Sequence, residues 1–71
     1  MNNRQFKELK VGDHVITNGL SRSNSGIKCE VTYICEDRIW IKPLKGERDF
    51  TDGCWAFPDW NEISYKAANL L

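Results

Sequence analysis

The side chains best suited to chemistry in this chain are three cysteines and the single histidine: Cys29, Cys35, Cys54 and His14. Together they have the ligand types of a Cys₃His zinc site. Zinc knuckles, however, place two ligands two to four residues apart on one turn, and no two of these residues are that close. Nucleophilic catalysis by a Cys–His pair requires the two side chains to meet in space, and nothing in their spacing indicates that they do. We therefore expect no metal site, no cofactor and no enzymatic activity.

The cysteines have a simpler interpretation as parts of a core. Cys29 and Cys35 share the alternation of the apolar residues around them, and small thiols are common core fillers. A lone histidine at the start of a strand, such as His14, is usually a surface or half-buried residue. The chain contains no glycine loop of the kind that cradles phosphate and no paired-carboxylate motif, so a small-molecule ligand is not expected.

The aromatic side chains are the better lead to function. Tryptophan and arginine dominate interface hot spots, and Arg38, Trp40 and Lys42 alternate along one run as a basic-aromatic stripe. Such a stripe suits an acidic protein surface or stacked bases, and the alternative is that Trp40 only covers a second small apolar cluster. The polar loop 20–25 is a further candidate contact surface or a plain connector. The candidate binding residues are Arg38, Trp40, Lys42, Trp55, Trp60 and Arg22.

A predicted β-hairpin across residues 26–43 positions the stripe. Apolar and polar residues alternate with period two on both sides of a short polar break, as in two strands with one buried face. A strict two-residue turn at Glu36 and Asp37 pairs Tyr33 with Trp40. These turn residues lack the glycine that tight turns prefer, so we favour a longer turn or a bulge near Ile34. This register buries the aliphatic side chains and Tyr33 on one face and leaves Trp40 on the other.

The rest of the chain is predicted to supply shorter strands and turns. Five or six short strands with turns at near-regular spacing indicate a mainly all-β fold, a small partly open barrel. Phe6 and Leu9 are expected to pack on the barrel, and Phe50, Phe57 and one tryptophan are expected to fill its core. The expected elements are an arm with a short helical turn at 1–9, turns at 10–13, 18–19 and 44–47, strands at 14–17 and from 48 to 51, a short strand at 54–57, a 3₁₀ turn near residues 58–61, a last strand at 62–65, and a tail at 66–71 that adds a helical turn or frays.

Length and charge limit the classes of function. Seventy-one residues make one domain, residues 1–71, with the barrel core at about 10–65. The formal net charge is zero, which argues against a protein held to nucleic acid mainly by bulk charge. Residues 1–48 nevertheless hold nine of the ten Lys and Arg and only six of the ten Asp and Glu. No signal peptide pattern or membrane-length apolar run is present, so we expect a cytoplasmic protein with reduced thiols.

The turn glycines and alternating aliphatics resemble those of a known group of folds. Over roughly residues 10–65 the pattern resembles SH3-like small β-barrels, particularly KOW-type and Tudor-like modules. In such barrels a short 3₁₀ turn separates the last two strands, which the segment 55–63 resembles. The residues that carry the resemblance of the first part are Gly12, Asp13, His14, Val15, Gly19, Gly26, Val31, Ile34, Ile39 and Ile41.

The resemblance implies a non-enzymatic binding module. Tudor-like and SH3 relatives bind peptides or modified side chains, whereas KOW-type relatives bind RNA, ribosomes or the transcription machinery. Zero net charge ranks a protein partner first, and we expect an adaptor or an inhibitor of a larger protein. A chain of this size beginning at Met1 suits a small accessory protein of bacteria or phages. The alternative is a KOW-like barrel that associates with nucleic acid (RNA or DNA), the ribosome or a transcription complex.

Overall fold

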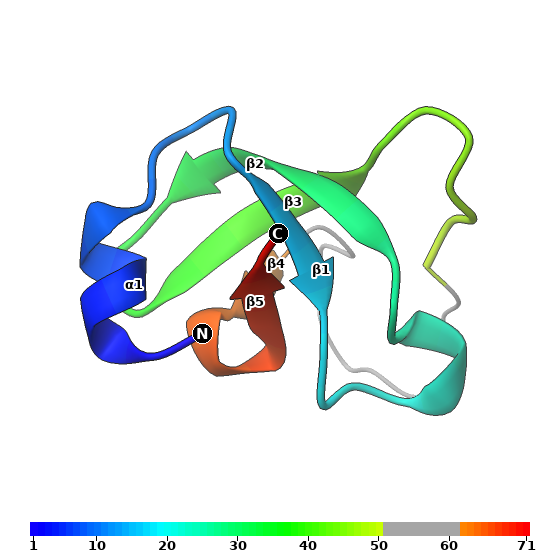
Figure 1. Cartoon of the computed structure of the whole chain (residues 1–71), viewed down its shortest axis with the longest axis horizontal. Coiled ribbons are helices and arrows are strands. Elements are labelled where there is room, and N and C mark those ends of the chain that lie inside the picture. Colours follow the sequence, from blue (N-terminus) through cyan, green and yellow to red (C-terminus); the bar gives the residue numbers. More distant parts are fainter. Residues whose placement is uncertain (51–61) are drawn as a thin grey trace.

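A computed structural model describes residues 1–50 and 62–71, and it is mainly sheet, as predicted. Five antiparallel strands form one sheet in the order β4-β3-β2-β1-β5 (Figure 1). The predicted 3₁₀ turn near residues 58–61 and the predicted strand at 54–57 lie outside the described residues, as do Trp55, Phe57 and Trp60. The elements are α1 (Asn3–Glu8), β1 (His14–Thr17), the 3₁₀ turn η1 (Arg22–Asn24), β2 (Lys28–Ile34), β3 (Arg38–Pro43), β4 (Glu62–Ser64), the 3₁₀ turn η2 (Tyr65–Ala67) and β5 (Ala68–Leu70).

Strand β1 has the bounds that the sequence predicts because a tight turn precedes it. The backbone N–H of Lys10 donates to Oδ2 of Asp13 (2.9 Å), and the backbone N–H of Asp13 donates to the Lys10 carbonyl (3.0 Å). Gly12 adopts a φ of 98°, a conformation that only glycine adopts without strain. This turn docks on β2, since the Gly12 N–H donates to the Val31 carbonyl (2.8 Å).

The β2–β3 hairpin forms with a bulge close to the predicted one near Ile34, but the predicted longer turn and the burial of Tyr33 are wrong. Ile34 pairs with Ile39, and the Cys35 N–H donates to the Arg38 carbonyl (2.9 Å), which is the strict two-residue turn rather than a longer one. A bulge lies between Val31 and Tyr33, so that Thr32 is the extra residue. The bulge reverses the alternation of β2 beyond Val31. It keeps the aliphatic side chains of both strands on one face and turns Tyr33 outward.

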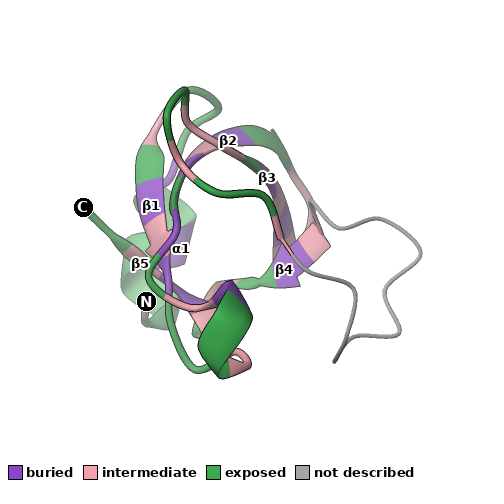
Figure 2. Ribbon diagram, turned by 90° about the vertical axis from the view of Figure 1, so that its right-hand side faces the viewer, coloured by how far each residue is buried: buried purple, intermediate pink, exposed green. Residues whose placement is uncertain are grey.

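The core lies on the concave side of the curved sheet. Figure 2 shows the strands bending around the buried residues, with α1 at one end of the enclosed space. Phe6 and Leu9 are both 7% exposed, so the predicted helical arm does pack on the sheet, and the Phe6 ring lies 4.9 Å from that of Tyr65. Phe50 packs against this core while remaining half-buried. The buried core residues are Phe6, Leu9, Val15, Ile27, Cys29, Val31, Ile39, Ile41, Ile63 and Ala68.

The tail and the segment after β3 differ from the prediction. The sheet does not end near residue 65, because β5 pairs with β1 through Ala68 opposite Thr17, and Ala68 is fully buried. The described part of the expected strand at 48–51 is irregular instead. Arg48 lies in this irregular segment. Its Nε donates to the Ser23 carbonyl (3.2 Å) and its Nη2 donates to the Ser25 carbonyl. These two bonds connect the segment to the loop that contains η1.

Among residues 1–50 and 62–71 no helix has both the length and the apolar character needed to cross a membrane.

Candidate binding face

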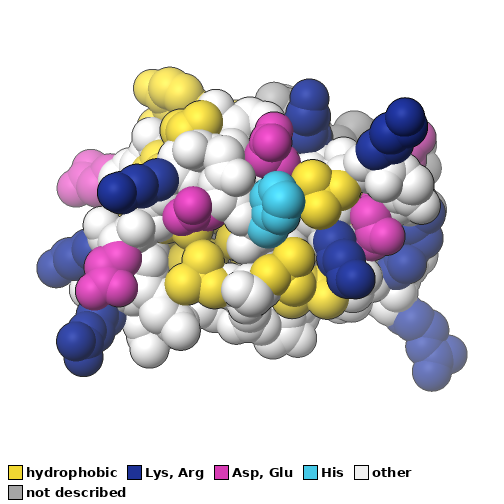
Figure 3. Space-filling view, turned by 45° about the horizontal axis from the view of Figure 1, so that its top comes forward, with side chains coloured by type: hydrophobic (Ala, Val, Ile, Leu, Met, Phe, Trp, Pro, Cys, Tyr) yellow, Lys and Arg dark blue, Asp and Glu magenta, His cyan; other side chains and the backbone are white. Residues whose placement is uncertain are grey.

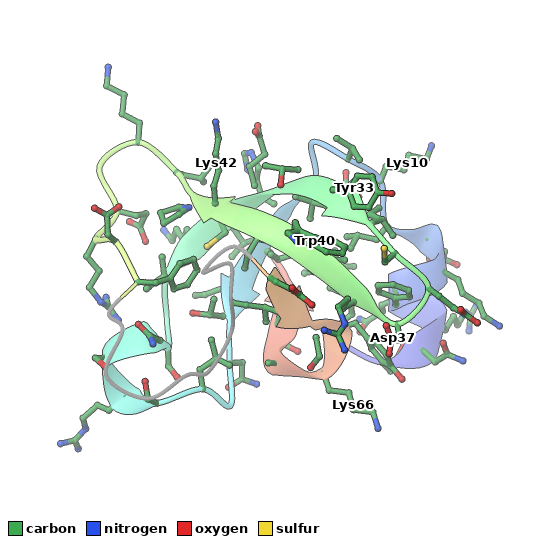
Figure 4. The ribbon with its side chains drawn as sticks, turned by 180° about the vertical axis from the view of Figure 1, so that it is seen from behind. Lys10, Tyr33, Asp37, Trp40, Lys42 and Lys66 are labelled. Atoms are coloured by element: carbon green, nitrogen blue, oxygen red, sulfur yellow. The ribbon has the colours of Figure 1, made fainter. Side chains whose placement is uncertain are left out.

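Two aromatic side chains meet on the outer face of the β2–β3 hairpin. The rings of Tyr33 and Trp40, which are cross-strand neighbours, lie 5.0 Å apart between centroids at an interplanar angle of 75°. This edge-to-face geometry is a favourable arrangement for aromatic quadrupoles. Tyr33 is 58% exposed and Trp40 is half-buried, and both lie on the side of β3 away from the core (Figure 4). We call Tyr33 and Trp40 the aromatic pair.

The bulge at Thr32 places the aromatic pair. The Thr32 hydroxyl donates to the Trp40 carbonyl (3.1 Å), which ties the bulge to the strand it faces. Sequence alternation assigned Tyr33 to the buried face, so the prediction missed it as a site residue. The lack of glycine at the hairpin turn, which suggested an irregularity, was the available signal, but it did not locate the bulge.

Arg38 does not present a free positive charge. Its Nη1 is bonded to Oε1 of Glu62 on β4, and its Nε lies 3.4 Å from Oδ1 of Asp37. The hydrogen bond to Glu62, followed by the charges of Glu62 and Asp37, raises the pKa of Arg38 above its ordinary value. Glu62, whose side chain is 13% exposed, is a second residue that the sequence did not single out. The predicted stripe therefore ends in a cluster in which the charge of Arg38 is offset by two carboxylates.

Lys42 lies on the same outer face as Trp40, two residues farther along β3. Side chains two apart on a strand share a face, and Figure 4 shows Lys42 extending away from the sheet beyond Trp40. Its cross-strand neighbour is Glu30, which in turn is paired with His14 on β1. Lys42 is exposed and forms no ion pair with any residue in 1–50 or 62–71.

Arg22 is not brought to the stripe. It is an exposed residue of η1, at the end of the molecule opposite the β2–β3 turn (Figure 1). Trp55 and Trp60, the remaining predicted contacts, lie outside the described residues. The structure thus brings Trp40, Lys42 and Arg38 together, adds Tyr33 and Glu62, and separates Arg22.

Cys29, Cys35 and His14 are not brought together, and Cys54 lies outside the described residues. Cys29 is fully buried, as the core interpretation predicts, whereas His14 is an exposed residue on β1 that pairs with outward-facing Glu30. Burial, with a smaller contribution from the charge of Glu47, raises the pKa of the Cys29 thiol to about 12. Cys35, expected in the core, is only half-buried because it follows the bulge. Within the described ranges no three His, Cys, Asp or Glu residues are grouped to hold a metal ion.

Charges of both signs are mixed on the face that surrounds His14 (Figure 3). In Figure 3 the histidine, shown in cyan, has acidic and basic side chains on several sides, and neither sign forms a continuous field on that face. Alternation of this kind leaves little long-range potential to attract a polyanion. The hairpin's outer face can therefore contribute apolar contact and directed hydrogen bonds more readily than bulk electrostatic attraction.

Comparison with known proteins gives no match to a family model, to a curated protein or to a solved structure.

Proposed function

We propose that this chain is a non-enzymatic, SH3-like binding module that recognises another protein through the outer face of β2 and β3. The fold part of the proposal is supported by the chain path at the sheet edges. The two edge strands, β4 and β5, follow one another in sequence and are separated by the 3₁₀ turn η2. A 3₁₀ turn between the last two strands is a feature of SH3-like barrels.

The observation that carries the functional proposal is the exposed aromatic pair. A tyrosine that is 58% exposed beside a half-buried tryptophan offers a rigid apolar surface with polar tips, which is the kind of surface enriched at protein interfaces. Ile39 and Ile41 are the buried residues of β3. The aromatic pair therefore adds more area to the protein surface than to the core. A partner that covers it buries apolar area now in contact with water.

A protein partner is favoured over nucleic acid by the charges around the pair. Binding to the phosphates of nucleic acid needs several free cations, whereas in the described part of this face Arg38 is bonded to Glu62 and Asp37, and Lys42 is an isolated charge. On this proposal the chain works as an adaptor or as an inhibitor of a larger protein. The two described cysteines, Cys29 and Cys35, are both free thiols, which is compatible with work in the reducing cytoplasm.

The test is affinity capture from a lysate of the source cells, with and without nuclease. Trp40→Ala and Tyr33→Ala are expected to reduce capture of the partner by about tenfold or more, as loss of an interface aromatic does. Leu71→Ala is the matched control. Leu71 is 60% exposed, like Tyr33, but it follows the edge strand β5, which is separated from β3 by β2 and β1.

Three results would contradict the proposal. If the partner is still captured after both aromatic substitutions, the aromatic pair is not part of the interface. Capture that disappears after nuclease treatment assigns the chain to nucleic acid. Loss of the folded spectrum in Trp40→Ala shows that Trp40 is needed for stability, and Tyr33→Ala then decides whether this face binds.

A further inference from the structure

Several carboxylates near the aromatic pair are engaged within the fold. Glu62 and Asp37 are paired with Arg38. On the neighbouring turns, Asp13 accepts from the backbone N–H of Lys10 and Glu47 accepts from the backbone N–H of Lys28 (both 2.9 Å). Glu30, which faces Lys42, and Glu36, which is exposed on the β2–β3 turn, form no ion pair with another described residue.

Apart from Arg38 and Thr32, the side-chain donors next to the aromatic pair are not engaged by any described residue. Within the described part of the chain, the ammonium of Lys42 has no hydrogen-bond or ion-pair partner, and neither have the indole N–H of Trp40 and the phenol of Tyr33. Lys10, on the turn before β1, likewise keeps its ammonium unpaired among these residues. The face thus offers free donors, and Lys42 is an unpaired cation on the same face of β3 as the ring of Trp40.

We propose that the aromatic pair and Lys42 together bind an extended segment of a protein partner in which a carboxylate lies two residues from an apolar side chain. This inference rests on the proposed function and names the chemistry of its ligand. Trp40 and Lys42 are two residues apart on β3, about 6.5 Å along the strand. An extended peptide laid along β3 presents its own residues on one face at the same spacing, so an apolar side chain on the aromatic pair sets a carboxylate two residues away beside Lys42.

Three short peptides test this spacing without knowledge of the natural partner. Ac-Ser-Glu-Ser-Phe-Ser-Glu-Ser-NH₂ has a carboxylate two residues from phenylalanine on both sides, so it fits in either chain direction. Ac-Ser-Ser-Glu-Phe-Glu-Ser-Ser-NH₂ has the same composition with adjacent carboxylates, which point to the other face of an extended chain. Ac-Ser-Gln-Ser-Phe-Ser-Gln-Ser-NH₂ lacks the charges. Each is titrated into ¹⁵N-labelled protein, and Kd is read from the Trp40 indole N–H signal, identified by its absence in Trp40→Phe.

The first peptide is expected to bind about threefold to fivefold more tightly than the other two, the range of one exposed ion pair. Lys42→Gln is expected to remove that preference, so that the variant binds the glutamate and glutamine peptides with equal Kd. Lys42→Glu is expected to reverse it, so that Ac-Ser-Lys-Ser-Phe-Ser-Lys-Ser-NH₂ binds more tightly than the glutamate peptide. Lys66→Gln, which removes an exposed lysine on η2, is the matched control and should change neither affinity.

Equal affinity for the three peptides, or a preference that survives Lys42→Gln, overturns the inference. Tighter binding of an oligothymidylate of similar length overturns it in favour of nucleic acid. If no peptide shifts the Trp40 signal although partner capture still depends on Trp40, the inference fails and the proposed function stands. If capture is independent of the aromatic pair, the proposed function itself fails.

Discussion

The buried side chain of Cys29 makes the stability of the fold depend on pH. Its thiol is fully buried on β2, and its Sγ–H donates weakly to the Ile27 carbonyl (3.4 Å). Burial penalises the thiolate, and the nearby carboxylate of Glu47 penalises it further, so the pKa rises from an ordinary value of 9.0 to about 12. Cys29 is thus an inert core residue under physiological conditions, because thiol reactivity requires the thiolate.

This pKa shift predicts a loss of stability in alkali. Below about pH 9 the thiol is protonated in both the folded and unfolded states. Between about pH 9 and about pH 12 the unfolded chain loses this proton while the folded chain keeps it. The free energy of unfolding should then fall by up to about 1.4 kcal/mol per pH unit. Urea unfolding at pH 8, 9 and about 10 measures the slope.

Cys29→Ala is the control for that measurement. The variant is expected to be less stable at every pH, since it leaves a small cavity, but its stability should depend less on pH above about pH 9. The difference between the two slopes isolates the contribution of the Cys29 thiol from that of every other group. Parallel slopes in the two proteins would show that Cys29 does not hold its proton in the folded state.

Among the elements, α1 depends most on its surroundings. It has only six residues, too few for a stable isolated helix, so capping and packing must hold it. Asn2 and Gln5 form a reciprocal capping box, with Oδ1 of Asn2 accepting from the Gln5 N–H (2.8 Å) and Oε1 of Gln5 accepting from the Asn2 N–H (2.9 Å). Phe6 anchors the helix against Tyr65.

Two substitutions separate the cap from the anchor. Asn2→Ala should lower the free energy of unfolding by about 1 kcal/mol, the usual value of an N-cap side chain. Phe6→Ala should lower it by about 3 kcal/mol, since it empties a buried aromatic position. Urea unfolding measures both, with exposed Lys7→Ala near zero as control. If Phe6→Ala and Lys7→Ala changed the free energy of unfolding equally, α1 would not pack on the sheet in solution.

The sequence predicts an element well where local turn chemistry bounds it. β1 is recovered to the residue because the Lys10–Asp13 turn precedes it and Asn18 and Gly19 follow it. The hairpin is recovered as an element, but its register depends on the bulge at Thr32, which places an extra residue in β2 and turns Tyr33 outward. The strict two-residue turn that pairs Tyr33 with Trp40 was one of the registers considered, but no local pattern specifies the position of the bulge. Tyr33 was therefore assigned to the buried face, although Trp40 was predicted on the outer one.

The parts that the sequence could not predict are those decided by distant contacts. Residues 66–71 read locally as a helical turn or a frayed end, and the 3₁₀ turn η2 does include Lys66 and Ala67. Pairing with β1, some fifty residues earlier, makes Ala68 to Leu70 a strand instead. Arg38 likewise reads as a free cation beside Trp40 until β4 brings Glu62 against it. Both errors come from interactions remote in the chain.

At the scale of the whole molecule, the two ends of the chain stabilise each other. The N-terminal ammonium of Met1 donates to the Ala68 carbonyl (2.6 Å) and to Oδ1 of Asn69 (2.5 Å). α1 packs on η2, and β5 pairs with β1. A domain of this size buries a limited share of its surface, so each of these long-range contacts carries a large part of a small net stability.

Deleting residues 66–71 therefore tests whether the tail belongs to the domain. The deletion removes β5, exposes the β1 edge and uncovers the fully buried Val15, which Leu70 faces across the strands. We expect the truncated chain to lose its dispersed ¹H–¹⁵N spectrum and its cooperative urea transition. Leu71→Ala, at an exposed position of the same tail, should keep both. A truncated chain that retains both would reduce the tail to a frayed appendage and place the folded unit within residues 1–65, with the outer face of β2 and β3 intact.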